Sequence, residues 1–355
     1  MVNAKHGENR FDVLRLIAAW LVLFSHSYPI SGASVGDPLT QIATLDTLGG
    51  VGVITFFALS GYLVTLSLQR NANLLVFLWH RIVRIYPALI VVCVFSMLVL
   101  GPLFTALPAG EYFQRPDTWR YLWSASGFVV VFQLPEIFNQ VPLARVVNGS
   151  LWSLPVEVRC YLALAVVSLM PAAMRYKALV VAAGLLAMLL LRPPAVPQHE
   201  AFFGLDYQHT KLGLVFALGA VYASWGDRIR PLFWPAAYLI GLAAALAAGT
   251  PVSTACFLLG AATLVLWLGL HAMWLPRIPE RMGDWSYGLF LYAFPVQQVL
   301  AHYGMHKAGL VPYVILSTVI ALAFAALSWH LVEKRALVLR RWARTQMLPA
   351  AAAIR

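Results

Sequence analysis

Residues 11–30 read FDVLRLIAAWLVLFSHSYPI, an apolar stretch with a basic residue near its start and a histidine near its end. An α-helix needs about 20 consecutive apolar residues to cross the hydrocarbon core of a bilayer. Comparable runs follow along the whole chain, and they are continuous and rich in Leu, Ala and Val. Continuous runs predict membrane-spanning helices, because the strands of a membrane β-barrel alternate apolar and polar residues over about ten positions.

The composition supports lipid as the solvent of this chain. Hydrophobic residues make up 61% of the 355 positions and charged residues 11%, whereas a soluble domain has about 45–50% and about 25%. We therefore predict an all-α polytopic membrane protein with one transmembrane domain over 1–345, a short cytoplasmic tail over 346–355 and no attached soluble domain. About ten spans of ~20 residues fit this length, at residues 11–30, 50–69, 82–103, 151–171, 177–191, 210–224, 233–248, 252–274, 284–303 and 310–332.

The net charge of +11 reflects where Lys and Arg gather. They concentrate in one set of loops between the predicted spans, and they gather again after the last span at Arg340, Arg341 and Arg344. Because basic residues collect in cytoplasmic loops, this set and both termini are predicted to be cytoplasmic. A membrane origin of the charge gives no reason to expect a nucleic-acid partner. The three cysteines all lie in apolar runs and predict core packing rather than a metal site.

The longest loop on the predicted outer side covers residues 104–150. Loops of this length are usually functional or disordered, and its Pro, Trp and Tyr residues favour order. We interpret it as a lid or substrate-facing element. Within it, residues 119–134 are apolar but short and Trp-rich. They predict a re-entrant or interfacial helix, and the alternative of an eleventh span would remove the charge asymmetry of the later loops.

Ionisable side chains inside membrane helices are costly and usually functional. Arg15 and His26 lie eleven positions apart in the first predicted span, which places them about 20° apart around a helix and about 16 Å apart along it. Arg15 would lie near the cytoplasmic end and His26 near the outer end. The structural alternatives are a snorkelling arginine and a histidine hydrogen-bonded to neighbouring backbone.

Other polar residues fall near the two ends of later spans. Arg81 and Arg84 share a face at the cytoplasmic mouth of the third span, where paired guanidinium groups suit phosphate or serve as a positive-inside anchor. Glu157 would lie about 9 Å deep, close to the depth of His26, or pair with its neighbour Arg159. The remaining polar residues are Ser60 near mid-membrane, Asp284 and Tyr287 near the inner end, Gln297 and Gln298 near the outer end, and His330 and Glu333, which we interpret as interfacial structure.

Five stretches of this sequence together resemble acyltransferase family 3, whose bacterial members include O-acetyltransferases of lipopolysaccharide O-antigen, exopolysaccharide and Nod-factor sugars. They occur in the family's order over nearly the whole chain. They read RFDVLRLIAAWLVLFSHS (10–27), FFALSGYLVTLSL (56–68), FLWHRIVRIYPAL (77–89), GSLWSLPVEVRCYL (149–162) and DWSYGLFLYAFPV (284–296).

The resemblance implies an acyl-CoA donor, usually acetyl-CoA, on the cytoplasmic side of a bacterial inner membrane and a glycan acceptor on the outer side. The essential histidine of the family falls on His26, and Glu157 lies in the family's L-P-V-E stretch. Both are predicted to be catalytic. The donor-binding residues are predicted to be Arg15, Arg81, Arg84, Ser60 and Tyr287. Many relatives carry a histidine where this chain has Ala293, so any role of that histidine is missing or taken by another group.

Two other function classes would also place polar residues in membrane helices. A transporter or flippase of a lipid-linked glycan would use buried Arg, His and Glu, but no internal repeat of the kind seen in many transporters is visible. A structural subunit of an envelope complex would not need Arg15 and His26 on one helix face. The acceptor sugar, the acyl group beyond acetyl and the oligomeric state are not predicted.

Overall fold

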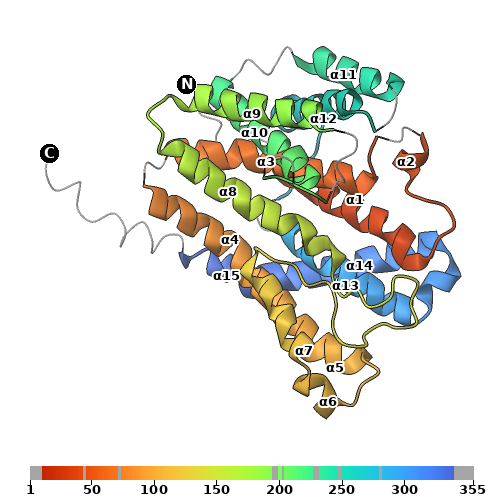
Figure 1. Ribbon diagram of the computed structural model, residues 1–355. Helices are drawn as coiled ribbons and strands as arrows, with labels where there is room; N and C mark the ends of the chain where they lie inside the picture. The colour runs from red at the N-terminus through yellow and green to blue at the C-terminus, as the bar shows by residue number, and fades with distance from the viewer. Residues whose placement is uncertain are drawn as a thin grey trace, which may run out of the picture. The chain divides into compact units, whose positions relative to one another are not determined.

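The computed structural model describes residues 10–42, 45–70, 73–193, 199–201, 204–226, 232–246, 249–279 and 282–339. Within these ranges the chain is built of helices joined by loops, and its β-structure is limited to isolated bridges, among them Thr105–Ile137 and Gln133–Val146 (Figure 1). The predicted tail over 346–355 lies outside the described residues.

In the described part of the chain, seven helical segments are long and apolar enough to cross a membrane, which confirms the all-α polytopic class. They are Phe11–Ser31 (α1), Leu48–Arg70 (α3), Leu74–Phe104 (α4 with its continuation), Gly149–Ser168 (a 3-10 turn and α8), Met174–Leu191 (α9), Pro251–His271 (α12) and Leu310–Ala336 (α14 with its continuation). The other three predicted spans are also helices: α10 (Tyr207–Trp225), α11 (Phe233–Ala245) and α13 (Ser286–His302). Of these, α11 has 13 residues and α13 has 17, so the count of ten and the sidedness of the termini stay predictions.

The contacts divide the chain into two compact units. The first consists of Met1–Ser25, Val35–Ser67 and Leu162–Ser286, and the second of His26–Ser34, Leu68–Tyr161 and Tyr287–Arg355. Helix α1 runs unbroken through the boundary between Ser25 and His26. The predicted single domain over 1–345 stays a prediction.

In the first unit, α3 and α10 pack backbone against backbone. A Cβ atom added at Gly61 would collide with the carbonyl oxygen of Phe216, and one added at Gly219 would collide with the carbonyl oxygen of Ala58. Small residues allow such close approach between membrane helices, so these two glycines are needed for packing. In the same unit, α9 lies along α10 and α11 along α12.

In the second unit, α4 is followed by a π-helical turn (Ser96–Leu100) and the short helix α5 (Gly101–Phe104). The last long helix, α14 (Leu310–Ser328), likewise continues into a π-helical turn (Trp329–Glu333). Helix α13 packs tightly on α14, because a Cβ atom at Gly288 would lie 2.8 Å from the Cα atom of Ala325. The hydroxyl of Tyr313 donates a hydrogen bond of 2.7 Å to the carbonyl oxygen of Gln297.

The predicted outer loop between α4 and α8 is folded into short helices and turns. It contains α6 (Ala109–Gln114), α7 (Pro116–Arg120) and a 3-10 helix (Tyr121–Ser126) that ends at Gly127 in a left-handed conformation. Residues 129–134 are non-helical. Residues 119–134 are therefore short helical turns followed by loop, and they do not form a continuous helix of spanning length.

Candidate active site

Helix α1 carries both of the residues that the sequence analysis placed at opposite ends of the first span. Arg15 and His26 lie within one continuous helix, Phe11–Ser31, so the rise of 1.5 Å per residue separates them by about 16 Å. Each has its own polar surroundings, which belong to different units.

In the second unit, His26 is bordered by a serine and a phenylalanine. Its Nδ1 atom lies 3.5 Å from the hydroxyl oxygen of Ser150, at hydrogen-bonding distance. Its ring meets the ring of Phe294 nearly edge-on, with centroids 5.2 Å apart. Ser150 and Phe294 are both buried, so these neighbours restrict the orientation of the imidazole.

Ser150 is held in place by the residue two positions before it. Asn148 begins the 3-10 turn Gly149–Ser153: its side-chain oxygen accepts the backbone N–H of Ser150 at 3.2 Å. The side-chain amide of Asn148 donates to the carbonyl oxygen of Leu291 in α13 at 2.8 Å. One buried asparagine therefore fixes the start of this turn, and with it Ser150, against α13.

The two glutamines of α13 join the surroundings of His26 to the outer loop. The amide of Gln297 donates to the hydroxyl of Ser27, the next residue after His26, at 2.7 Å. The amide of Gln298 donates to the carbonyl oxygens of Leu143 at 2.8 Å and Val146 at 2.5 Å. The prediction that these glutamines lie at the depth of His26 is confirmed.

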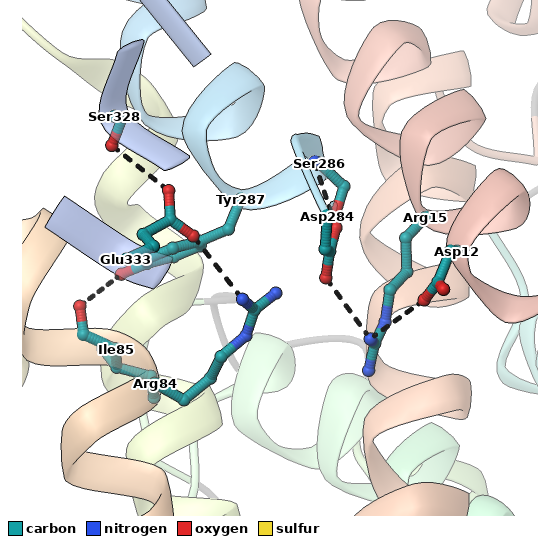
Figure 2. Close-up of polar contacts among 9 residues, drawn as sticks. All are labelled: Asp12, Arg15, Arg84, Ile85, Asp284, Ser286, Tyr287, Ser328 and Glu333. Carbon is teal, nitrogen blue, oxygen red and sulfur yellow. Dashed lines mark hydrogen bonds and ion pairs between the residues drawn. The ribbon is translucent and has the colours of Figure 1, made fainter. Parts of the chain in front are cut away.

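Near the other end of the second unit, Arg84 pairs with Glu333 (Figure 2). The closest atoms of their charged groups lie 3.5 Å apart, and the Glu333 side chain is 2% exposed. Glu333 also accepts the hydroxyl of Ser328 at 3.1 Å. The Arg84 guanidinium lies over the ring of Tyr287 at 5.7 Å, and the Tyr287 hydroxyl donates to the carbonyl oxygen of Ile85 at 2.9 Å. The carboxylate of Glu333 is therefore buried and paired, and its position at the inner interface stays a prediction.

Arg81 and Glu157 share a neighbour in the second unit. The Arg81 guanidinium lies 5.9 Å from the ring centroid of Tyr161, and at the same distance from that of Phe77. The Tyr161 hydroxyl donates to the Glu157 carboxylate. The described polar partner of His26 is thus Ser150, while Glu157 is hydrogen-bonded to Tyr161.

In the first unit, Arg15 pairs with Asp284 at 3.6 Å and approaches Asp12 at 4.0 Å (Figure 2). Asp284 also accepts the backbone N–H of Ser286 at 3.1 Å, and the Ser286 hydroxyl. This carboxylate therefore caps the first residue of α13 while it holds Arg15. Ser60, also in this unit, is buried in α3 beside the close helix contact at Gly61.

Comparisons with known proteins give the chain its family. A family model described as an acyltransferase domain matches residues 8–330. An O-acetyl transferase of Shigella phage Sf6 is 31% identical over 339 residues, covering 93% of this chain and 96% of the phage protein. Nodulation protein 10 of Rhizobium leguminosarum bv. viciae is 31% identical over 360 residues, covering 94% of each chain. No solved structure matches.

The chain belongs to acyltransferase family 3.

As a member of this family it is an acyltransferase, and its apolar helices make it a multi-pass membrane protein. Of the predicted residues of this acyltransferase, Arg84 and Tyr287 are in direct contact, and Arg81 and Glu157 both contact Tyr161. Ser150 and Phe294, which lie beside His26, were not predicted as site residues. Ser150 lies in one of the quoted family stretches and Phe294 directly follows Ala293. The sequence does not indicate which helix either side chain contacts.

Proposed function

We propose that this acyltransferase moves an acyl group, with acetyl as the default, from cytoplasmic acyl-CoA to a hydroxyl of an exported or cell-surface glycan, or of its lipid-linked precursor, in a bacterial inner membrane. The observation that carries the proposal is the pairing of the His26 imidazole with the buried Ser150 hydroxyl, on the same helix as Arg15. The name of the phage O-acetyl transferase supports the O-acyl class.

His26 can act as a general base if its Nε2 atom is free of a proton. That requires the proton on Nδ1, which would then donate to the Ser150 hydroxyl oxygen 3.5 Å away. Nε2 takes the proton of the acceptor hydroxyl while the hydroxyl oxygen attacks the thioester carbonyl carbon. The new C–O bond forms, the C–S bond breaks, and the CoA thiolate takes the proton from the imidazolium.

A two-step route uses the same atoms. Nε2 attacks the thioester carbonyl carbon, the C–S bond breaks, and the CoA thiolate leaves as the thiol with the Nδ1 proton. The glycan hydroxyl oxygen then attacks the acyl carbon, the C–N bond breaks, and the imidazole takes up the hydroxyl proton. Both routes need an imidazole of fixed orientation, which supports a positioning role for Ser150. Glu157, hydrogen-bonded to Tyr161, is proposed to balance positive charge in the active site.

We propose that Arg15, Arg81 and Arg84, which the charge pattern predicts on the cytoplasmic side, bind the phosphates of the donor, with Ser60 and Tyr287 as further donor contacts. Guanidinium groups bind phosphate through paired, charge-assisted hydrogen bonds. The carboxylate of Glu333 holds Arg84 in place, and such preorganisation lowers the entropy lost on binding.

The test is transfer of labelled acetyl from acetyl-CoA to glycan by membranes that contain the protein. We expect His26→Ala to lower the rate by about 10²–10⁴-fold, the usual contribution of general acid–base catalysis. His302→Ala is the matched control, because His302 lies in the same unit but packs against Phe104 at 5.1 Å. Normal labelling by a folded His26→Ala protein would overturn the proposal. A transporter or flippase would leave no label on glycan with either protein.

A further inference from the structure

The ring of Phe294 fills the space between His26 and the backbone that carries Ser150. Its centroid lies 5.2 Å from that of His26, with the ring planes 76° apart. A Cβ atom at Gly149 would lie 2.5 Å from one ring carbon of Phe294 and 2.8 Å from another. Glycine at this position therefore lets the ring pack directly against the backbone.

This arrangement is rigid. Phe294 is 2% exposed. The backbone at Gly149, which the ring contacts, is held to α13 by the hydrogen bond from the Asn148 amide to the carbonyl oxygen of Leu291. Leu291 lies three residues before Phe294 in the same helix. Residues three apart on a helix lie on one side of it, so Leu291 and Phe294 face the same turn. Because close-packed side chains leave few voids larger than a water molecule, the ring has little room to move away from His26.

We propose that Phe294 limits the acyl group that this enzyme accepts, so that acetyl reacts and longer straight-chain acyl groups are excluded. The inference rests on the proposed function, because it requires the acyl carbonyl to react beside His26. In either route the acyl carbon lies next to the imidazole. The tail of the acyl group must then occupy space along the imidazole, and the Phe294 ring closes one side of that space.

The expected preference for acetyl-CoA over longer donors can be estimated from the effect of one methylene group. In an apolar pocket, one additional methylene group in a substrate changes kcat/KM by roughly 10–200-fold. The wild-type enzyme should therefore prefer acetyl-CoA to propionyl-CoA by at least about tenfold, and to butyryl-CoA by more. Replacing the ring with a methyl group should remove most of this preference while leaving His26 and Ser150 in place.

The experiment measures kcat/KM for acetyl-, propionyl- and butyryl-CoA with the wild type, Phe294→Ala and Phe294→Leu in detergent. Tyr292→Ala is the matched control. It removes an aromatic ring of similar size from the same helix, but Tyr292 stacks on Phe324 at 5.6 Å, away from His26. The ratio of rates with two donors does not depend on how much of each preparation is folded, and the milder Phe294→Leu change guards against loss of the fold.

We expect the propionyl-to-acetyl ratio to rise about tenfold or more in Phe294→Ala, to rise less in Phe294→Leu, and to stay at the wild-type value in Tyr292→Ala. An unchanged ratio in both Phe294 variants, with an active wild type, would overturn the inference alone. A wild type that transfers none of the three acyl groups to glycan would instead overturn the proposed function.

Discussion

The Arg84 guanidinium lies 3.5 Å from the carboxylate of Glu333, whose side chain is 2% exposed. The two residues are 249 positions apart, so the pair joins the middle of α4 to the end of the α14 segment. Taking one partner from a buried pair leaves an uncompensated charge, whereas replacing both with apolar residues is often tolerated. The pair can therefore be tested by comparing single and double substitutions.

We predict that Arg84→Met lowers the free energy of unfolding by about 3 kcal/mol, the lower end of the range for breaking a buried pair. The double variant Arg84→Met/Glu333→Leu should recover most of that loss, because no buried charge remains. Thermal unfolding in detergent measures both. A double variant with the summed losses of its two single variants would contradict the prediction.

Asp284 and a donor phosphate would compete for Arg15. The carboxylate lies 3.6 Å from the guanidinium, and it also accepts the backbone N–H of Ser286 at 3.1 Å. Asp284→Asn keeps an oxygen for that cap but removes the negative charge. We predict that this variant lowers the KM for acyl-CoA a few-fold, while Arg15→Gln raises it. A higher KM in Asp284→Asn would show instead that the carboxylate positions Arg15 for the donor.

Ser150 is predicted to act by positioning His26. Ser150→Ala removes one hydrogen bond, with a net value of about 1–1.5 kcal/mol, so kcat should fall about tenfold while the KM for acyl-CoA stays unchanged. Ser150→Thr keeps the hydroxyl and should retain more activity. Equal losses in both variants would point to packing alone.

The positions of the apolar helices could be predicted from the sequence. So could the end of a helix near which a given polar residue lies. The apolar runs set the helices, and counting residues along α1 placed Arg15 and His26 at its two ends. Gln297 was placed at the depth of His26 by the same reasoning, and its hydrogen bond to Ser27 confirms it. Depth is predictable because a fixed rise per residue converts position into distance.

Partners across helices could not be predicted in this way. An apolar run does not fix the rotation of a helix about its axis, so Ser150 and Phe294 gave no sign of facing His26. Glu333 shows the same limit, because nothing in its own stretch of sequence indicates that Arg84, 249 positions away, is its partner.

The contribution of Asp206, at the start of α10, to the stability of the fold should decrease in acid. Burial works to raise the pKa of Asp206, but hydrogen bonds from the backbone and ring of His209 outweigh it and lower the pKa below its usual value. A lowered pKa stabilises the fold above the usual carboxyl range near 4, and the stabilisation is lost as pH falls through that range. We predict that the wild type unfolds at a higher temperature than Asp206→Asn at pH 7, and that this difference shrinks by pH 3. A constant difference would contradict the prediction.

The predicted outer loop is tied to α13 and to the end of α1. The amide of Gln298 donates to two loop carbonyl oxygens, those of Leu143 and Val146. Beside these anchors, Pro142 packs closely on Gly32, the residue that follows α1. A Cβ atom added at Gly32 would lie 2.9 Å from the side chain of Pro142. Gln298→Leu removes both of these part-buried hydrogen bonds, which contribute about 0.5–1.5 kcal/mol each.

We therefore expect Gln298→Leu to lower the unfolding temperature and to expose the loop around Leu143 to limited proteolysis. Arg145→Ala is the control. It removes an ion pair with Glu136 in which the arginine is 56% exposed, and exposed pairs contribute about 0–1 kcal/mol. If the loop covers the acceptor site, Gln298→Leu also raises the KM for the glycan more than that for acyl-CoA. Faster cleavage of the loop with an unchanged KM for the glycan would show that the loop does not contribute to acceptor binding.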